Sequence, residues 1–175
     1  MNQLYFRRLH PANAEDLVEW QRVFRGTQSF TFATEGRPPT DADAERMMRT
    51  LPAGRSQDDV HVLAIYAGES LCGCAFIMRG YPKPEITYLV LLILMEAFQG
   101  QSLGPACLKH VEALARSWES SKLAAVVDSA NDRALTFWRR QGFLEVQRRE
   151  LPGLVGQAIS IEKALSPNPS IERTA

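Results

Sequence analysis

The sequence has few cysteines and no cluster of metal ligands. Its cysteines are Cys72, Cys74 and Cys107, and the Cys-x-Cys pair lacks the spacing and the histidine partners of a zinc site. An odd and sparse set of this kind indicates buried, reduced thiols rather than a disulfide framework. We therefore expect no metal and a reducing compartment, the cytoplasm.

The sequence also lacks an excess of charge and a long apolar run. Its 20 Lys and Arg residues balance 20 Asp and Glu residues, and they are spread along the chain. A nucleic-acid partner has no electrostatic support in such a chain. The most apolar run, residues 88–95, is far too short to cross a bilayer, and residues 1–6 show no signal peptide. These absences predict a cytoplasmic protein without membrane or nucleic-acid partners.

The residues that are present suffice for one globular domain. A chain of 175 residues with 45% hydrophobic and 23% charged residues can bury a core without disulfides or metals. Neither an internal repeat nor an interior linker divides it. We expect one domain over residues 3–165 and a disordered tail over residues 166–175, where two prolines accompany little apolar content.

Hydrophobic periodicity predicts strands and helices that fit a mixed sheet. Strand character marks residues 4–9, 60–67, 71–78, 86–95, 124–127, 143–148 and 157–162. Helical periodicity and caps mark residues 14–24, 41–51, 102–119 and 132–141. The second and third strands are expected to form an antiparallel hairpin, and the run at 86–95, apolar on both faces, a central strand. The predicted fold class is α/β or α+β, a sheet flanked by helices.

A turn rich in small residues joins the run at 86–95 to the next helix. It comprises Gln99, Gly100, Gln101, Ser102, Leu103 and Gly104. Small residues allow the backbone to curl so that several N–H groups point into one concavity, with the positive end of the helix dipole behind them. Pro105 is compatible with the first turn of that helix. The turn is therefore a candidate phosphate-binding site.

A second segment, residues 127–143, carries small and aromatic residues at helical spacing. Asn131, Ala134 and Trp138 lie at i, i+3 and i+7, which places them on one helix face. Gly142 is positioned to end this helix, and Phe143 starts the next strand.

Both segments resemble signatures of the GNAT superfamily of N-acetyltransferases. The pattern Gln99-x-x-Ser102-x-Gly104 resembles its pyrophosphate-binding motif, which reads Gln or Arg, two residues, Gly, one residue, Gly or Ala. Ser102 stands in place of the middle glycine. The segment from Val127 to Phe143 resembles the family's late signature. The two occur in the family's order and at about its separation, and the predicted strand and helix order matches as well.

The resemblance implies a GNAT-like, mostly antiparallel mixed sheet that splays between its fourth and fifth strands, with acetyl-CoA as co-substrate. The pyrophosphate would lie on residues 99–104, and the pantetheine would extend the fourth strand through backbone groups of Leu92, Ile93 and Leu94. Asn131 and Trp138 would face the pantetheine and the thiol end. The family usually has a tyrosine at the position of Trp138, whose phenol protonates the departing thiolate. Indole cannot supply that proton.

Transfer of an acetyl group to an amine requires a neutral amine, a polarised carbonyl and a stable leaving thiolate. Because an amine with a pKa of about 10.4 is mostly protonated at neutral pH, a carboxylate or a water chain must take its proton. Asp128 and Glu85 are the candidate bases, and Glu96 is a third. Asp128 alternatively caps the following helix, and Glu96 alternatively favours the positive helix start. A backbone N–H near Leu94 is expected to bind the oxyanion.

The acceptor and the assembly state stay open at this point. The region between Phe24 and Asp41 is expected to form part of the acceptor pocket, and its Phe30 and Phe32 indicate a partly apolar substrate. The acceptor could be a small amine, an antibiotic, an amino acid or a protein terminus, and the chain could be a monomer or a homodimer. Two other hypotheses are a non-catalytic acyl-CoA-binding module of the same fold and an interaction domain without affinity for CoA.

Overall fold

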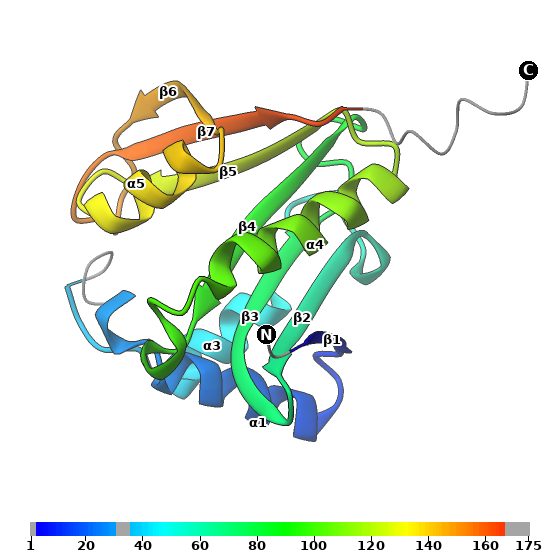
Figure 1. Cartoon of the computed structure of the whole chain (residues 1–175), viewed down its shortest axis with the longest axis vertical. Coiled ribbons are helices and arrows are strands. Elements are labelled where there is room, and N and C mark those ends of the chain that lie inside the picture. Colours follow the sequence, from blue (N-terminus) through cyan, green and yellow to red (C-terminus); the bar gives the residue numbers. More distant parts are fainter. Residues whose placement is uncertain (1–2, 31–35, 167–175) are drawn as a thin grey trace, which may run out of the picture.

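The computed structural model describes residues 3–30 and 36–166, which form a seven-stranded sheet flanked by helices (Figure 1). The strand order is β1-β2-β3-β4-β5-β7-β6. Neighbouring strands are antiparallel except β4 and β5, which are parallel. The predicted mixed, mostly antiparallel sheet is therefore confirmed. Phe32 and the part of the predicted tail beyond Ser166 lie outside the described residues.

The helices and strands follow the sequence prediction to within a few residues. The strands are β1 (Leu4–Leu9), β2 (Val60–Ala67), β3 (Ser70–Met78), β4 (Ile86–Leu94), β5 (Lys122–Asp128), β6 (Leu144–Arg149) and β7 (Ala158–Ala164). The helices are α1 (Ala14–Arg25), α3 (Asp41–Arg49), α4 (Leu103–Ser117) and α5 (Asp132–Arg140), with 3₁₀ turns η1 (Gln57–Asp59) and η2 (Glu96–Phe98). Asn13 and Thr40 accept hydrogen bonds from the first turns of α1 and α3, as short polar side chains do at helix N-termini.

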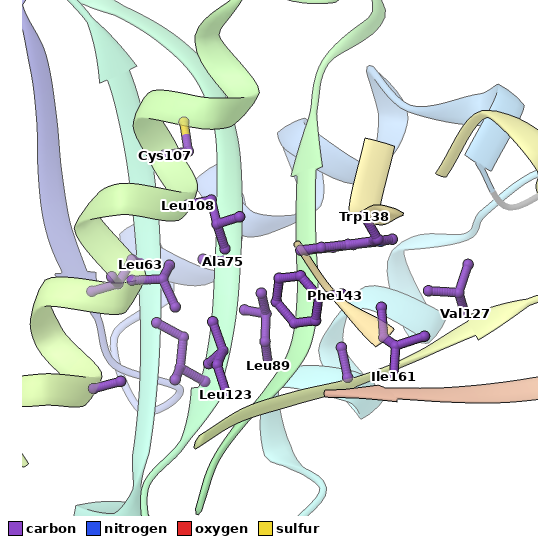
Figure 2. Packing of buried hydrophobic residues seen from close by; sticks show 14 of the residues in the cluster. Leu63, Ala75, Leu89, Cys107, Leu108, Leu123, Val127, Trp138, Phe143 and Ile161 are labelled. Atoms are coloured by element: carbon purple, nitrogen blue, oxygen red, sulfur yellow. The ribbon is translucent and has the colours of Figure 1, made fainter. Parts of the chain in front are cut away.

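Each face of the sheet carries its own apolar cluster. On one face, Leu108 of α4 and Trp138 of α5 pack in what we name the α4 cluster (Figure 2). On the other face, Trp20 of α1 and Met48 of α3 pack with Phe76 of β3 in the α1 cluster. Burial of apolar side chains on both faces is the dominant favourable term in folding. The sheet is thus the middle layer of the fold. Because helices pack on both of its faces, the strand edges and strand ends are the parts of the sheet most open to a ligand.

The pairing between β4 and β5 is short, and this opens the sheet. Ile86 to Leu89 pair with Lys122 to Ala125, while β4 stays paired with β3 as far as Leu94. Beyond Leu89, the edge of β4 on the β5 side has no strand hydrogen-bonded to it among the described residues. Figure 1 shows β5, β7 and β6 diverging from β4. The splay predicted between the fourth and fifth strands is confirmed.

A β-bulge lies where these two strands part. Ile77 pairs with Leu89 and Phe76 pairs with Leu91, so Val90 is an extra residue in β4. One inserted residue reverses the alternation of side chains along a strand. Accordingly, Leu89 packs in the α4 cluster and Leu91 in the α1 cluster. The bulge therefore decides which side chains of the second half of β4 face each side of the sheet.

At the paired end of β4 and β5, the hydroxyl groups of Thr87 and Ser120 share a buried hydrogen bond of 2.8 Å. Thr87→Val keeps the side-chain shape but removes this partner, and we expect it to lower the free energy of unfolding by about 1–3 kcal/mol. Urea denaturation measures the loss. The double variant with Ser120→Ala should lose less than the sum of the single losses, whereas strict additivity would show that the bond does not couple the two strands.

Candidate active site

The turn that follows β4 adopts two left-handed backbone conformations. Gly100 has φ 76° and Ser102 has φ 60° with ψ 20°. A left-handed conformation costs a non-glycine residue roughly 1–2 kcal/mol, which explains why glycine suits the middle position of this motif. The side chain of Gln99 folds back and its Nε2 donates to the Leu94 carbonyl at 2.8 Å. Gln99 therefore fixes the turn to the end of β4.

The backbone of the turn presents free donors at a helix start. No described residue accepts a hydrogen bond from the N–H groups of residues 100–104, and the Ser102 side chain does not cap α4. These donors lie at the N-terminus of a 15-residue helix, where the helix dipole is positive. Uncapped N–H groups in this arrangement form a ready site for phosphate.

Gly104 has a packing role that the sequence did not indicate. A Cβ atom at this position would lie 3.0 Å from Cε2 of Phe137 in α5. The start of α4 therefore approaches α5 closely only because residue 104 has no side chain. This contact brings together two motifs that are more than 20 residues apart in the sequence.

The start of α5 contributes a capping residue and a buried aromatic. Asn131 Oδ1 accepts a hydrogen bond from the Ala134 N–H at 3.0 Å, and the side-chain NH2 group of Asn131 donates to no described residue. Trp138 is only 8% exposed and packs edge-on against Phe137 and Phe143, with ring centroids 4.9 Å apart in each pair. Figure 2 shows Trp138 above Phe143 in the α4 cluster. Gly142 ends the helix with φ 85°, as predicted.

A cleft of about 920 Å³ joins these parts, and it lies between β4, the turn and α5. Most of the predicted cofactor-binding residues line it: Leu92, Ile93, Leu94, Gln99, Gly100, Ser102, Leu103, Gly104, Asn131 and Trp138. Gln101 does not line the cleft, and its Nε2 donates to the Ala97 carbonyl at 2.9 Å. The structure thus brings the two predicted segments to one place.

Two arginines on the cleft wall were missed by the sequence reasoning. Arg133 and Arg140 of α5 line the cleft, and no described carboxylate forms an ion pair with either. Asp132 is the acidic residue on the same wall, so the charged side chains carry one net positive charge. The i, i+7 spacing of the two arginines on the helix that bears Trp138 was the available signal. Their charge favours an anionic ligand.

The direction of backbone groups along β4 follows from one hydrogen bond. The Met95 N–H donates to the Cys72 carbonyl of β3 at 2.8 Å. Since backbone groups of successive residues in a strand point to opposite edges, those of Ile93 face β3, where Ile93 pairs with Cys74. Those of Leu92 and Leu94 face the cleft. We therefore keep Leu92 and Leu94 as candidates for backbone contacts and drop the backbone role expected for Ile93.

Asp128 occupies a structural position rather than the expected catalytic one. Its carboxylate is 4% exposed and accepts hydrogen bonds from the N–H groups of Ala130, Val155 and Gly156, at 2.8, 3.2 and 3.0 Å. It does not line the cleft. Three backbone donors hold this carboxylate between the β5–α5 turn and the loop before β7. We do not retain Asp128 as a base, and the alternative helix-capping role belongs to Asn131 instead.

Neither Glu85 nor Glu96 lines the cleft. Glu85 is exposed and precedes the paired end of β4, roughly 20 Å along the strand from Leu92. Its expected position near the opening is therefore wrong. Glu96 is exposed, and its Oε1 accepts a hydrogen bond from the Ser29 N–H at 2.8 Å, which lowers the pKa of the Glu96 carboxyl. Glu96 thus ties residues 26–30 to the end of β4.

The three thiols are buried and free. Burial raises the pKa of the Cys72 thiol to about 11 and that of Cys107 to about 12, so neither is a nucleophile at neutral pH. Within residues 3–30 and 36–166, no group of three or more His, Cys, Asp and Glu side chains could hold a metal ion. No helix in the described part of the chain is long and apolar enough to cross a membrane.

A splayed sheet with a donor-rich turn at the end of its fourth strand is the arrangement that the resemblance to the GNAT acetyltransferases implied. The chain matches the Acetyltransferase (GNAT) family over residues 17–143. This match spans more than half of the chain, and the chain therefore belongs to the GNAT acetyltransferase family.

Solved structures of acetyltransferases share this fold. An acetyltransferase from Thermus thermophilus is 27% identical, with a TM-score of 0.76 over 93% of this chain and 97% of that one. The ribosomal-protein-S18-alanine N-acetyltransferase of Escherichia coli is 15% identical, with a TM-score of 0.67 over 99% of each chain. Spermidine N-acetyltransferase from Vibrio cholerae, solved with CoA and spermine, is 12% identical, with a TM-score of 0.71 over 94% of this chain and 97% of that one. At these identities the last two show the fold alone. No curated protein matches the chain significantly.

The roles assigned to Asp128 and Glu85 predict that a conservative substitution destabilises the protein at the first position and has little effect at the second. Asp128→Asn replaces an acceptor of three N–H bonds with a group that must turn a donor toward them, so we expect a loss of about 1–3 kcal/mol of stability. Glu85→Gln, at an exposed site, should change stability by less than about 0.5 kcal/mol. Thermal unfolding of the two variants compares these effects. Equal stability of Asp128→Asn and the unsubstituted protein would contradict the structural role.

Proposed function

We propose that this protein is an N-acetyltransferase that moves an acetyl group from acetyl-CoA to a primary amine. One observation carries the proposal: the donor-rich turn, the start of α5 and the unpaired edge of β4 line a single cleft. Family membership supports acetyl transfer in general. The chemistry of the cleft supports a thioester with a long anionic carrier.

The parts of acetyl-CoA match successive parts of the cleft. Its pyrophosphate would accept hydrogen bonds from the N–H groups of residues 100–104, and its charge would be favoured by Arg133 and Arg140, which line the same cleft. Its pantetheine amides would bond to the backbone of Leu92 and Leu94, as an added strand does. Asn131 would donate from its amide group, and the buried Trp138 would form an apolar wall beside the sulfur.

In the proposed reaction, the neutral amine nitrogen attacks the thioester carbonyl carbon. A C–N bond forms, the C–S bond breaks, the amine nitrogen loses a proton and the thiolate gains one, so the products are an amide and free CoA. The cleft-facing Leu94 N–H would donate to the carbonyl oxygen as negative charge develops on it. The chain thus supplies orientation and a fixed dipole to the step.

The proton of the acceptor is proposed to leave through water. None of the candidate bases Asp128, Glu85 and Glu96 lines the cleft, and the one carboxylate among the described residues that does, Asp132, is the exposed first residue of α5. A water chain satisfies the requirement that the ammonium be deprotonated before attack. The amine pKa itself, rather than that of a side chain, should then set the rising limb of the pH–rate profile.

A non-catalytic acyl-CoA-binding module is the second candidate, because Trp138 replaces the tyrosine that usually protonates the thiolate. A thiol with a pKa of about 8.5 is already a tolerable leaving group, so the missing acid does not by itself abolish turnover. Acetylation of an amine above the uncatalysed rate separates this candidate from an enzyme.

Binding of acetyl-CoA is predicted to depend on the charge at residue 102. Asn and Asp are nearly isosteric and both tolerate the left-handed conformation that Ser102 adopts. Ser102→Asp places a negative charge against the pyrophosphate and should weaken binding well over tenfold, whereas Ser102→Asn should stay within about threefold of the unsubstituted protein. Isothermal titration calorimetry measures both.

Ser102→Gly serves as a control for folding and backbone strain. Glycine removes the left-handed penalty, so this variant should bind acetyl-CoA normally and unfold at an equal or higher temperature. Equal affinity of folded Ser102→Asp and Ser102→Asn would remove the turn from the phosphate site.

The role of Trp138 is tested with Phe and Tyr. Trp138→Phe keeps an apolar wall and should change kcat by less than about threefold, with some loss of stability because the packed indole is buried. Trp138→Tyr restores a phenol and should maintain or raise kcat. Rates are measured at saturating acetyl-CoA with an amine that the unsubstituted enzyme acetylates. A hundredfold fall in folded Trp138→Phe would show that the indole N–H takes part in the chemistry.

A further inference from the structure

A second hollow lies on the opposite face of the sheet from the α4 cluster. It has a volume of about 520 Å³ and lies between α1, α3 and strands β3 and β4. Its wall is apolar and includes Phe24, Phe30, Met47, Leu51, Phe76 and Val90. We name it the apolar hollow. Its size is ordinary for a small-molecule site.

The apolar hollow reaches β4 at the point where the sheet opens. Val90 lines it, and Val90 is the bulged residue that directly follows Leu89, the last residue of β4 paired with β5. Leu92 of the cofactor cleft is two residues farther, roughly 7 Å along the strand. Since no described strand pairs with this edge of β4, the hollow and the cleft border the same stretch of the strand.

Phe30 lines both the apolar hollow and the cofactor cleft. Its segment is held in place by the bond from the Ser29 N–H to Glu96 and by the bond from the Glu96 N–H to the Gly26 carbonyl, each 2.8 Å. Both bonds join this segment to the residues just after β4. Phe30 therefore stands at the boundary between the two spaces.

The charges at the rim of the apolar hollow disfavour a second cation. Asp43 is the carboxylate on the wall, and it forms ion pairs with Arg37 at 2.6 Å and with Arg46 at 2.5 Å. Hydrogen bonds from Arg37 and Thr40 keep the pKa of Asp43 far below its ordinary value, so it stays ionised and neutralised by its partners. Among the described residues that line the hollow, no carboxylate other than this paired one is available to an ammonium group buried there.

We propose that the acceptor is a primary monoamine with an apolar tail, which occupies the apolar hollow while its amino group reaches the edge of β4 near Leu94, the proposed position of the thioester carbonyl. This assignment rests on the proposed acetyl transfer and specifies its substrate class. It separates this chain from enzymes whose acceptors are polycations, because an acceptor of that kind needs acidic side chains around its tail.

Hexylamine and 1,6-diaminohexane form a matched test pair, since they differ by one cationic group at the end of the same tail. With acetyl-CoA saturating, release of the free thiol of CoA gives kcat/KM for each amine. We expect hexylamine to be preferred at least tenfold. A ratio near one, or a preference for the diamine, would overturn the assignment.

Met47 provides a control that locates the tail. Met47→Glu places a carboxylate on the wall of the hollow, and Met47→Gln places a neutral group of the same shape there. Met47→Glu should lower the preference for hexylamine at least tenfold or reverse it, whereas Met47→Gln should keep it. Acetyl-CoA should bind both variants as it binds the unsubstituted protein. Identical ratios in the two variants would place the tail elsewhere.

The outcomes distinguish this assignment from the proposed function. Binding of acetyl-CoA with acetylation of spermidine or kanamycin but not of hexylamine would overturn the substrate class and leave acetyl transfer intact. Binding of acetyl-CoA without acetylation of hexylamine or any of these amines also contradicts the assignment. Failure to bind acetyl-CoA at all would contradict the proposed function itself.

Discussion

The short pairing of β4 with β5 is the constraint on which the rest of this structure depends. Four residue pairs hold the strands together, from Ile86 with Lys122 to Leu89 with Ala125, and then Val90 bulges and the strands part. An unpaired strand edge presents free N–H and C=O groups, which usually invite another chain. Here the edge is flanked by the start of α4 and by α5, so it lies within a cleft. A ligand with amide groups of its own is the natural partner of such an edge.

The two sides of the opening between β4 and β5 differ in charge and polarity. On the side of α4 and α5, uncapped N–H groups and two arginines favour an anion. On the side of α1 and α3, an apolar hollow has a neutralised carboxylate at its rim. Beyond the bulge at Val90 the side chains alternate, with Leu91 on the side of the α1 cluster and Leu92 on the side of the α4 cluster, so one strand forms a wall of both spaces. In the proposed reaction the cofactor and the acceptor meet across this strand from opposite sides.

The sequence predicted the elements of the fold and the residues of the cofactor cleft because both depend on local pattern. Periodicity and caps located the strands and helices, and small residues at 100, 102 and 104 identified the turn. Features that depend on distant pairing could not be found this way. The bulge at Val90 exists only in the register between β3 and β4. Two of the N–H donors to the Asp128 carboxylate belong to Val155 and Gly156, which lie 27 and 28 positions later in the chain. Because local sequence does not reveal these partners, a catalytic role of Asp128 could not be distinguished from a structural one. Glu85 was misplaced because the chain does not reveal which end of β4 stays paired.

The most direct test of the cofactor site is to observe which amides meet the cofactor. In a ¹⁵N-labelled sample titrated with CoA, we predict the largest chemical-shift changes at the N–H groups of residues 100–104 and of Leu92 and Leu94, with smaller changes at Ile93, whose backbone faces β3. Asp128 and Glu85 should shift little, because neither lines the cleft. Saturable binding that leaves residues 100–104 unshifted, or no saturable binding of CoA, would contradict the assignment of this cleft.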